Sequence, residues 1–125
     1  MTYDLTITDK DDWLHATVTG PNTIGNVDGY MQELFEACRK SDCSRLLIEE
    51  RLEGPRLSTL EVFKVVSKRA EESRGYFMSI AYVDLNAEGD LMTFAETVAK
   101  NRGSQVKVLP TVIEAEDWLS KRDEA

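Results

Sequence analysis

Apolar and polar residues alternate at the start of the chain, which is the pattern of strands with one buried face. Residues 3–7 show this alternation, and residues 14–18 repeat it after an aspartate-rich segment. A period of two places every second side chain on the same face of a sheet. The first twenty residues therefore predict a β-hairpin, whose two strands are antiparallel.

Apolar residues recur with the helical period in the segments 27–38, 60–70, 91–99 and 112–119. The second of these helices opens with the sequence Ser58-Thr59-Leu60-Glu61, which is the pattern of a capping box. In a capping box the Ser58 hydroxyl accepts from the N–H of Glu61, and the Glu61 side chain accepts from the N–H of Ser58. On a helical wheel Val65 falls beyond the apolar face, past Arg69, so we expect Val65 to be exposed.

Three further strands are predicted at residues 45–50, 77–83 and 106–108. The first contains the continuous apolar run Leu46-Leu47-Ile48, which suits a strand that is covered on both faces, as in a parallel sheet. The resulting order, ββαβαβαβα, predicts an α/β fold with four main helices and a mostly parallel five-stranded sheet, in which the N-terminal hairpin strand is antiparallel. We expect residues 1–125 to form a single domain, with a frayed tail at 121–125.

Composition and charge restrict the class of protein. Hydrophobic residues make up 42% and charged residues 30% of the 125 residues, as in soluble globular domains. The net charge of −8 argues against nucleic-acid binding. The sequence shows neither a signal peptide nor a membrane-length apolar run, so we expect a cytoplasmic protein that does not insert into membranes. The two cysteines, Cys38 and Cys43, are then expected to be reduced thiols.

The sequence contains no complete catalytic or metal-binding motif. Glu49 and Glu50 form the most suggestive pair of acids, but neighbours on a strand point to opposite faces of the sheet. They therefore cannot flank one scissile bond. We expect no enzyme activity, no cofactor and no bound metal.

Four short motifs carry a resemblance to a known fold. They are Gly20-Pro21, Leu46-Leu47-Ile48, Asn101-Arg102-Gly103 and Ala115-Glu116-Asp117-Trp118-Leu119. In order and spacing, across residues 3 to 120, they resemble the STAS fold of anti-sigma-factor antagonists and, more closely, the SpoIIAA-like family of small bacterial domains. The resemblance implies a regulatory or protein-interaction module without intrinsic catalysis.

The resemblance also suggests where a partner would bind. In the antagonist branch a partner kinase phosphorylates a serine at the start of the helix after the third strand, and Ser58 occupies the matching place. That branch has an Asp-Ser-Ser-Gly-like motif, whereas this chain reads Arg56-Leu57-Ser58-Thr59-Leu60. We expect a surface for a protein partner on the loop after the third strand and on the helix that starts at Ser58. The residues of this candidate surface are Arg51, Arg56, Ser58, Thr59 and Val65.

Two alternatives remain open from the sequence. The same surface could serve a homodimer. The SpoIIAA-like family also resembles lipid-binding Sec14-type domains in overall fold, so a small apolar ligand or a lipid is the other class of partner.

Overall fold

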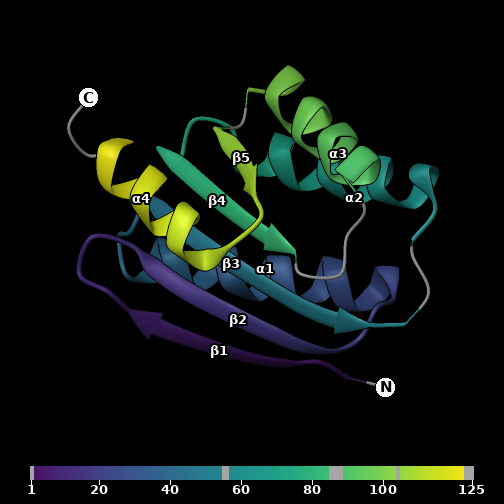
Figure 1. The fold of residues 1–125 in the computed structure, drawn as a ribbon, viewed down its shortest axis with the longest axis horizontal. Helices are drawn as coiled ribbons and strands as arrows, with labels where there is room; N and C mark the ends of the chain where they lie inside the picture. Colours follow the sequence, from purple (N-terminus) through teal and green to yellow (C-terminus); the bar gives the residue numbers. More distant parts are fainter. Residues whose placement is uncertain (1, 55–56, 85–88, 104, 123–125) are drawn as a thin grey trace.

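A computed structural model describes residues 2–54, 57–84, 89–103 and 105–122 of the chain. The described residues form five strands and four helices in the predicted order (Figure 1). The strands are β1 (Asp4–Asp9), β2 (Leu14–Pro21), β3 (Arg45–Glu53), β4 (Ser79–Asp84) and β5 (Val106–Leu109). The helices are α1 (Ile24–Lys40), α2 (Thr59–Glu72), α3 (Gly89–Asn101) and α4 (Val112–Arg122).

The strands form one sheet in the order β1-β2-β3-β4-β5. β1 is antiparallel to β2, and the other neighbouring strands are parallel. In the turn between β1 and β2, the N–H of Lys10 donates to the carbonyl of Trp13 at 2.9 Å, and Asp11 adopts a φ of 70°. The predicted α/β fold, with a mostly parallel sheet and an antiparallel N-terminal strand, is confirmed.

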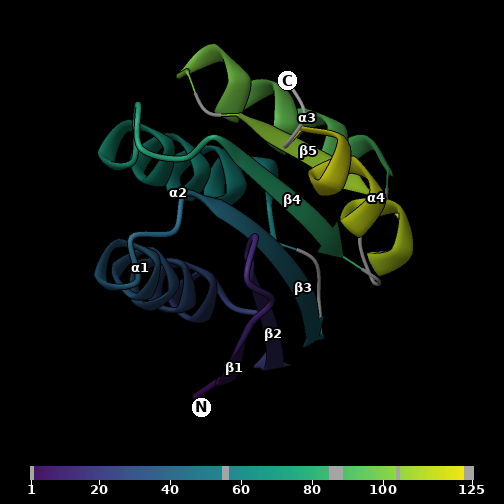
Figure 2. The same cartoon turned by 90° about the vertical axis from the view of Figure 1, so that its left-hand side faces the viewer.

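The helices cover the sheet unequally. Right-handed crossovers between successive parallel strands place each connecting helix on the same side when the strand order is sequential. α1, α2 and α3 accordingly lie on one face, while α4 follows the last strand and packs on the opposite face against β3 and β4 (Figure 2). This arrangement creates two cores, and the larger one lies under α1 and α2.

β3 runs through the centre of the sheet and is buried on both faces from Arg45 to Glu50, as its apolar run predicts. The predicted end of this strand at Glu50 is wrong, because pairing with β2 continues to Glu53, opposite Pro21. Glu49 and Glu50 therefore lie inside a buried strand and not at an exposed exit. Gly54, with a φ of 117°, then turns the chain toward α2.

Other boundaries differ by a few residues from the prediction. β4 begins at Ser79 and not at residue 77, because Phe77 instead packs its ring on Phe35, with 4.9 Å between the centroids. Residues 121 and 122 belong to α4, so this part of the predicted frayed tail is helical, and residues 123–125 lie outside the described residues. Cys38 and Cys43 are free thiols, as predicted.

Candidate functional site

The capping box predicted at the start of α2 is present. The N–H of Glu61 donates to the Ser58 hydroxyl, and the N–H of Ser58 donates to the Glu61 carboxylate, both at 3.1 Å. Ser58 is exposed and its backbone is extended, as an N-cap residue requires. The prediction that the helix begins beside Ser58 is therefore confirmed.

The predicted exposure of Val65 is wrong. Val65 is only 6% exposed and belongs to the larger core, whereas Leu60 and Phe63 are 61% and 38% exposed. The reason is the orientation of Arg69, whose guanidinium turns toward α1 and pairs with Asp28 at 2.6 Å. Arg69 therefore does not mark the solvent side of α2, and the face that carries Val65 is the buried face.

Of the candidate surface residues, the structure describes the side chains of Arg51, Ser58 and Val65, and the burial of Val65 separates it from the other two. Arg51 lies on the opposite face of β3 from Leu52 and Glu50, and its guanidinium pairs with Glu49 at 2.5 Å. Arg56 lies outside the described residues. Thr59 is the first residue of α2, but its side chain also lies outside what the structure describes. Ser58 is exposed at the end of the loop that leads into α2.

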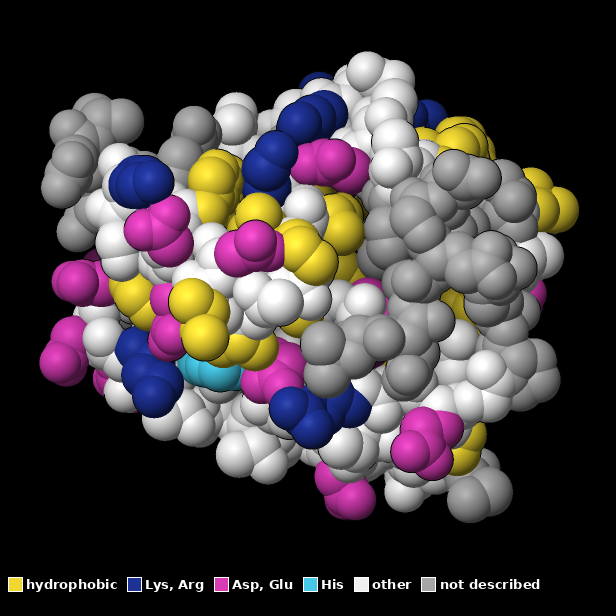
Figure 3. Space-filling view, viewed as in Figure 1, with side chains coloured by type: hydrophobic (Ala, Val, Ile, Leu, Met, Phe, Trp, Pro, Cys, Tyr) yellow, Lys and Arg dark blue, Asp and Glu magenta, His cyan; other side chains and the backbone are white. Residues whose placement is uncertain are grey.

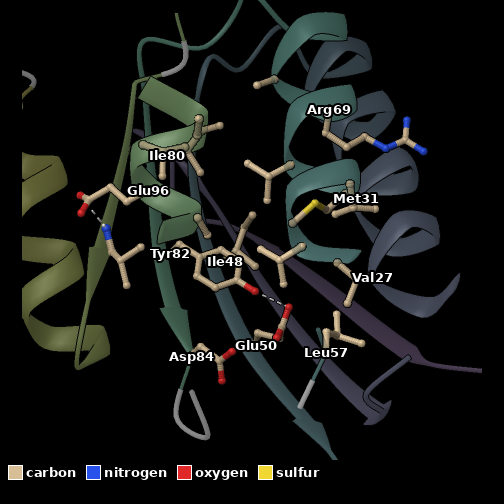
Figure 4. A pocket seen from close by; sticks show the side chains of 18 of the residues that line it. Val27, Met31, Ile48, Glu50, Leu57, Arg69, Ile80, Tyr82, Asp84 and Glu96 are labelled. Carbon is tan, nitrogen blue, oxygen red and sulfur yellow. Dashed lines mark hydrogen bonds between the residues drawn. The ribbon is translucent and has the colours of Figure 1, made fainter. Parts of the chain in front are cut away.

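A cavity of about 130 Å³ lies between the sheet and the helices α1, α2 and α3 (Figure 4). For comparison, an apolar cavity of about 150 Å³ holds a benzene molecule. The exposed residue Gly54 and the half-buried residues Asn22 and Leu57 line one end, so this end adjoins solvent. Most other lining side chains are apolar, and they include Met31, Ile48, Val62, Val65, Ile80 and Val106.

The polar end of the cavity is built around Glu50, which is 4% exposed. Tyr30 from α1 and Tyr82 from β4 both donate their hydroxyls to Oε2 of Glu50 (Figure 4 shows the bond from Tyr82). Asp84, the last residue of β4, is the register partner of Glu50 on the neighbouring parallel strand. These groups lie toward the carboxyl ends of β3 and β4, which is where open α/β sheets bind ligands.

Burial raises the pKa of Glu50 from 4.5 to about 8, helped by the negative charge of Asp84 and by a hydrogen bond between the two carboxyl groups, although the hydrogen bonds from the two tyrosines oppose this change. Glu50 therefore keeps its proton at neutral pH. Burial and the nearby Glu50 raise the pKa of both Tyr30 and Tyr82 well above 10.0, so their hydroxyls remain donors. This end of the cavity can hold a proton and can both donate and accept hydrogen bonds.

A second polar cluster lies on the opposite face of the sheet, where α4 leaves β2 uncovered. Glu49 accepts from Arg51 at 2.5 Å and lies 3.0 Å from Nε2 of His15. Burial would raise the pKa of Glu49, but the hydrogen bonds and charges of His15 and Arg51 outweigh it and lower the pKa. Figure 3 shows acidic and basic side chains intermingled on this face. The cluster is a satisfied ion-pair group and not a cavity.

Glu50 was not predicted as a site residue, because the sequence pattern excluded it only as half of an acid pair with Glu49. Its signal is the alternation along β3, which places Glu50 on the same face as Leu46 and Ile48 and hence toward the apolar side of α1. An acid on the core face of a buried strand requires a partner or a proton. Its tyrosine partners come from distant segments of the chain, so they could not be identified from local sequence.

Comparison with solved structures identifies the fold. The chain superposes on the crystal structure of an uncharacterised DUF3478-family protein from Shewanella loihica PV-4, which is described as having a SpoIIAA-like fold. The TM-score is 0.57 at 20% sequence identity, and the match covers 94% of each chain. This chain has a SpoIIAA-like fold. No family model and no curated protein matches the sequence.

Within the SpoIIAA-like fold, the cavity occupies the side of the sheet that α1, α2 and α3 cover. In the described part of the chain, no group of three or more His, Cys, Asp or Glu residues is arranged to hold a metal ion. No helix in that part is long and apolar enough to cross a membrane. Its apolar lining and the buried Glu50 at its polar end make this cavity the candidate site.

Proposed function

We propose that this protein is a non-catalytic binding domain whose cavity takes a small, largely apolar ligand. The observation that carries the proposal is the 130 Å³ apolar cavity, with a buried carboxyl group at the carboxyl edge of β3 and β4. Binding sites for small molecules are typically apolar with a few polar groups that fix orientation. The volume suits an apolar group of about six carbon atoms.

The position of the only histidine supports a non-catalytic role. His15 contacts Glu49, which lies on the opposite face of β3 from Glu50. A general base must lie within hydrogen-bonding reach of the proton that it removes. His15 is therefore separated by the sheet from the cavity and its buried acid.

A titration with 1-hexanol tests the proposal. We expect chemical-shift changes in the amide spectrum that saturate and that concentrate on α2, α3 and the facing residues of β3 and β4. Ala95→Leu, which fills part of the cavity from α3, should weaken binding by about tenfold or more. Thr97→Leu also introduces a leucine, but on the exposed side of α3, and should leave binding unchanged. Equal effects of the two variants, or no saturable change, would contradict the proposal.

A regulatory or interaction role through the loop before α2 is the second candidate function. It is favoured by the exposed Leu60 and Phe63, which follow directly after the Ser58 cap. Arg102 extends this surface, because its guanidinium lies 5.1 Å from the centre of the Phe63 ring. With Val65 buried, Leu60 replaces it as the apolar centre of the proposed partner surface. Arg56 and the side chain of Thr59 lie outside what the structure describes and stay in this proposal only by their positions in the sequence.

Sedimentation of the wild-type protein and of Leu60→Asp tests the homodimer version of this second candidate. Self-association that the aspartate abolishes would support it. Self-association that persists in the variant would place the interface on another surface.

A further inference from the structure

The charged residues that line the cavity are mostly acidic. Glu50, Asp84 and Glu96 are acidic lining residues, and Arg69 is the only basic residue in the described lining. The Arg69 guanidinium lies in ion pairs with Asp28 at 2.6 Å and with Glu72 at 2.7 Å. Figure 4 shows it directed away from the cavity. The positive charge of Arg69 is therefore already paired with acidic residues of α1 and α2.

Glu50 and Asp84 together form the polar end of an otherwise apolar space. They stand at aligned positions on adjacent parallel strands, so both side chains lie on the same face of the sheet. The two tyrosine hydroxyls donate to the same oxygen of Glu50, Oε2. A ligand that donates hydrogen bonds and carries positive charge would complement these carboxyl groups.

We propose that the cavity selects ligands that join a short apolar body to an ammonium group, with the ammonium between Glu50 and Asp84. This inference rests on the proposed function, because it specifies the ligand class of the same cavity. An ammonium offers three N–H donors and a compact charge, which suits two adjacent carboxyl groups. Neutral ligands of equal size fill the apolar space but lack the charge, and anionic ligands are repelled.

Binding of an ammonium would change the protonation of Glu50. An ammonium beside Glu50 favours its carboxylate form, so binding releases the Glu50 proton to solvent at pH values below about 8. Affinity for the ammonium should therefore rise with pH up to that value. The titratable and charged groups that line the cavity with Glu50 or contact it come from α1, β4, α2 and α3, and they are Tyr30, Tyr82, Asp84, Arg69 and Glu96.

Calorimetric titration with hexylammonium, 1-hexanol and hexanoate tests the proposal. Near pH 7.5 we expect hexylammonium to bind at least about tenfold more tightly than 1-hexanol, and hexanoate to bind most weakly. Titrations in buffers of different ionisation enthalpy should show close to one proton released per hexylammonium near pH 6.5. They should show none released on binding of 1-hexanol.

Two cavity variants and one control complete the experiment. Glu50→Gln and Asp84→Asn should each lower the affinity for hexylammonium far more than the affinity for 1-hexanol, so that the preference is lost, and Glu50→Gln should also lose the proton release. Glu53→Gln makes the same change at an exposed position of β3 and should preserve both. Using two cavity variants keeps the test decisive if one of them does not fold.

The outcomes separate this inference from the proposed function. If 1-hexanol binds while hexylammonium binds no more tightly, the ammonium proposal is overturned and the apolar cavity stands as a binding site. If the preference persists in both cavity variants, the ammonium proposal is likewise overturned. If none of the three probes binds, both proposals fail.

Discussion

Glu50 is the residue on which the account of this protein depends most. Glu50 is only 4% exposed. It lies on the apolar side of the sheet, beside a second acid, Asp84. Two tyrosine hydroxyls satisfy one of its oxygens. An ionised carboxylate in such a place is costly, so the folded protein favours the protonated acid.

The raised pKa of Glu50 predicts a specific loss of stability with pH. The folded protein binds this proton more tightly than the unfolded chain, so the stabilising contribution is complete below about pH 4.5. It is lost progressively as the pH rises toward about 8. The loss is at most about 1.4 kcal/mol per pH unit. Urea denaturation between about pH 5 and pH 9 measures it.

Glu50→Gln provides the comparison for this pH dependence. Glutamine keeps an acceptor oxygen for the tyrosines but does not titrate, so we expect its stability relative to the wild type to increase as the pH rises. Glu53→Gln, at the exposed end of β3, should follow the wild-type profile. Parallel profiles for the wild type and Glu50→Gln would show that Glu50 does not titrate as described.

Ser58 makes a local contribution to stability that can be measured separately. Ser58→Ala removes the acceptor for the N–H of Glu61, and we expect a loss of about 1 kcal/mol in the free energy of unfolding. Ser58→Asp restores an acceptor at a helix N-terminus and should be nearly neutral. An alanine variant as stable as the wild type would mean that solvent replaces the cap at no cost.

Residues with local partners were predictable from sequence, and residues with distant partners were not. The Ser58 cap depends on Glu61, three positions away, and the sequence predicted it. Val65 was misplaced because Arg69 turns toward α1 to pair with Asp28, which is distant in the sequence. Glu50 was missed as a site because its hydroxyl partner Tyr30 also lies on α1.

The helix α2 buries a different face from the one that the helical wheel predicts. Val65→Asp places a charge in the core, and we expect a loss of about 3 kcal/mol or more in the free energy of unfolding. Leu60→Asp makes a comparable change at a 61% exposed position of the same helix and should shift the melting temperature little. If Leu60→Asp lowered the melting temperature more than Val65→Asp, then Leu60 and not Val65 would lie on the buried face of α2, as the helical wheel predicts.

The contact between α1 and α2 depends on the ion pair between Asp28 and Arg69. The Arg69 side chain is only 7% exposed, so removing Asp28 leaves a buried guanidinium with Glu72 as its remaining paired acid. We expect Asp28→Ala to lower the free energy of unfolding by about 1–3 kcal/mol.

Lys68→Ala is the matched control for this ion pair. Lys68 also pairs with Asp28, at 3.5 Å, but its side chain is 55% exposed. Exposed pairs contribute little, so we expect a change below about 0.5 kcal/mol in chemical denaturation. A loss as large as that of Asp28→Ala would mean that Lys68, and not Arg69, provides the important contact.

Periodicity predicted the kind and order of the elements, but it predicted their ends less well. Five strands and four helices follow from the alternation and helical patterns in the described residues. The end of β3 was placed too early because its last residues are charged, while their place in the sheet depends on pairing with β2 up to Pro21. Strand ends are therefore set by the neighbouring strand as much as by local composition.

At the scale of the whole molecule, the sequential strand order explains why one side of the sheet carries a cavity. Three helices share that side, and α2 and α3 pack on each other as well as over the sheet. The space between these helices and the sheet depends on how the helices pack. The types of residue and their spacing along the sequence do not determine that packing. The SpoIIAA-like fold was recognisable from sequence, but the cavity was not.

The location of bound 1-hexanol in the protein with labelled methyl groups tests directly whether the cavity is a binding site. Intermolecular nuclear Overhauser effects report proximity between ligand protons and individual methyl groups. The account predicts contacts to the methyl groups of Ile48, Val65 and Ile80, which line the cavity. Contacts confined to Leu47, Leu119 and other methyl groups of the core under α4 would contradict it, as would the absence of any contact at saturating ligand.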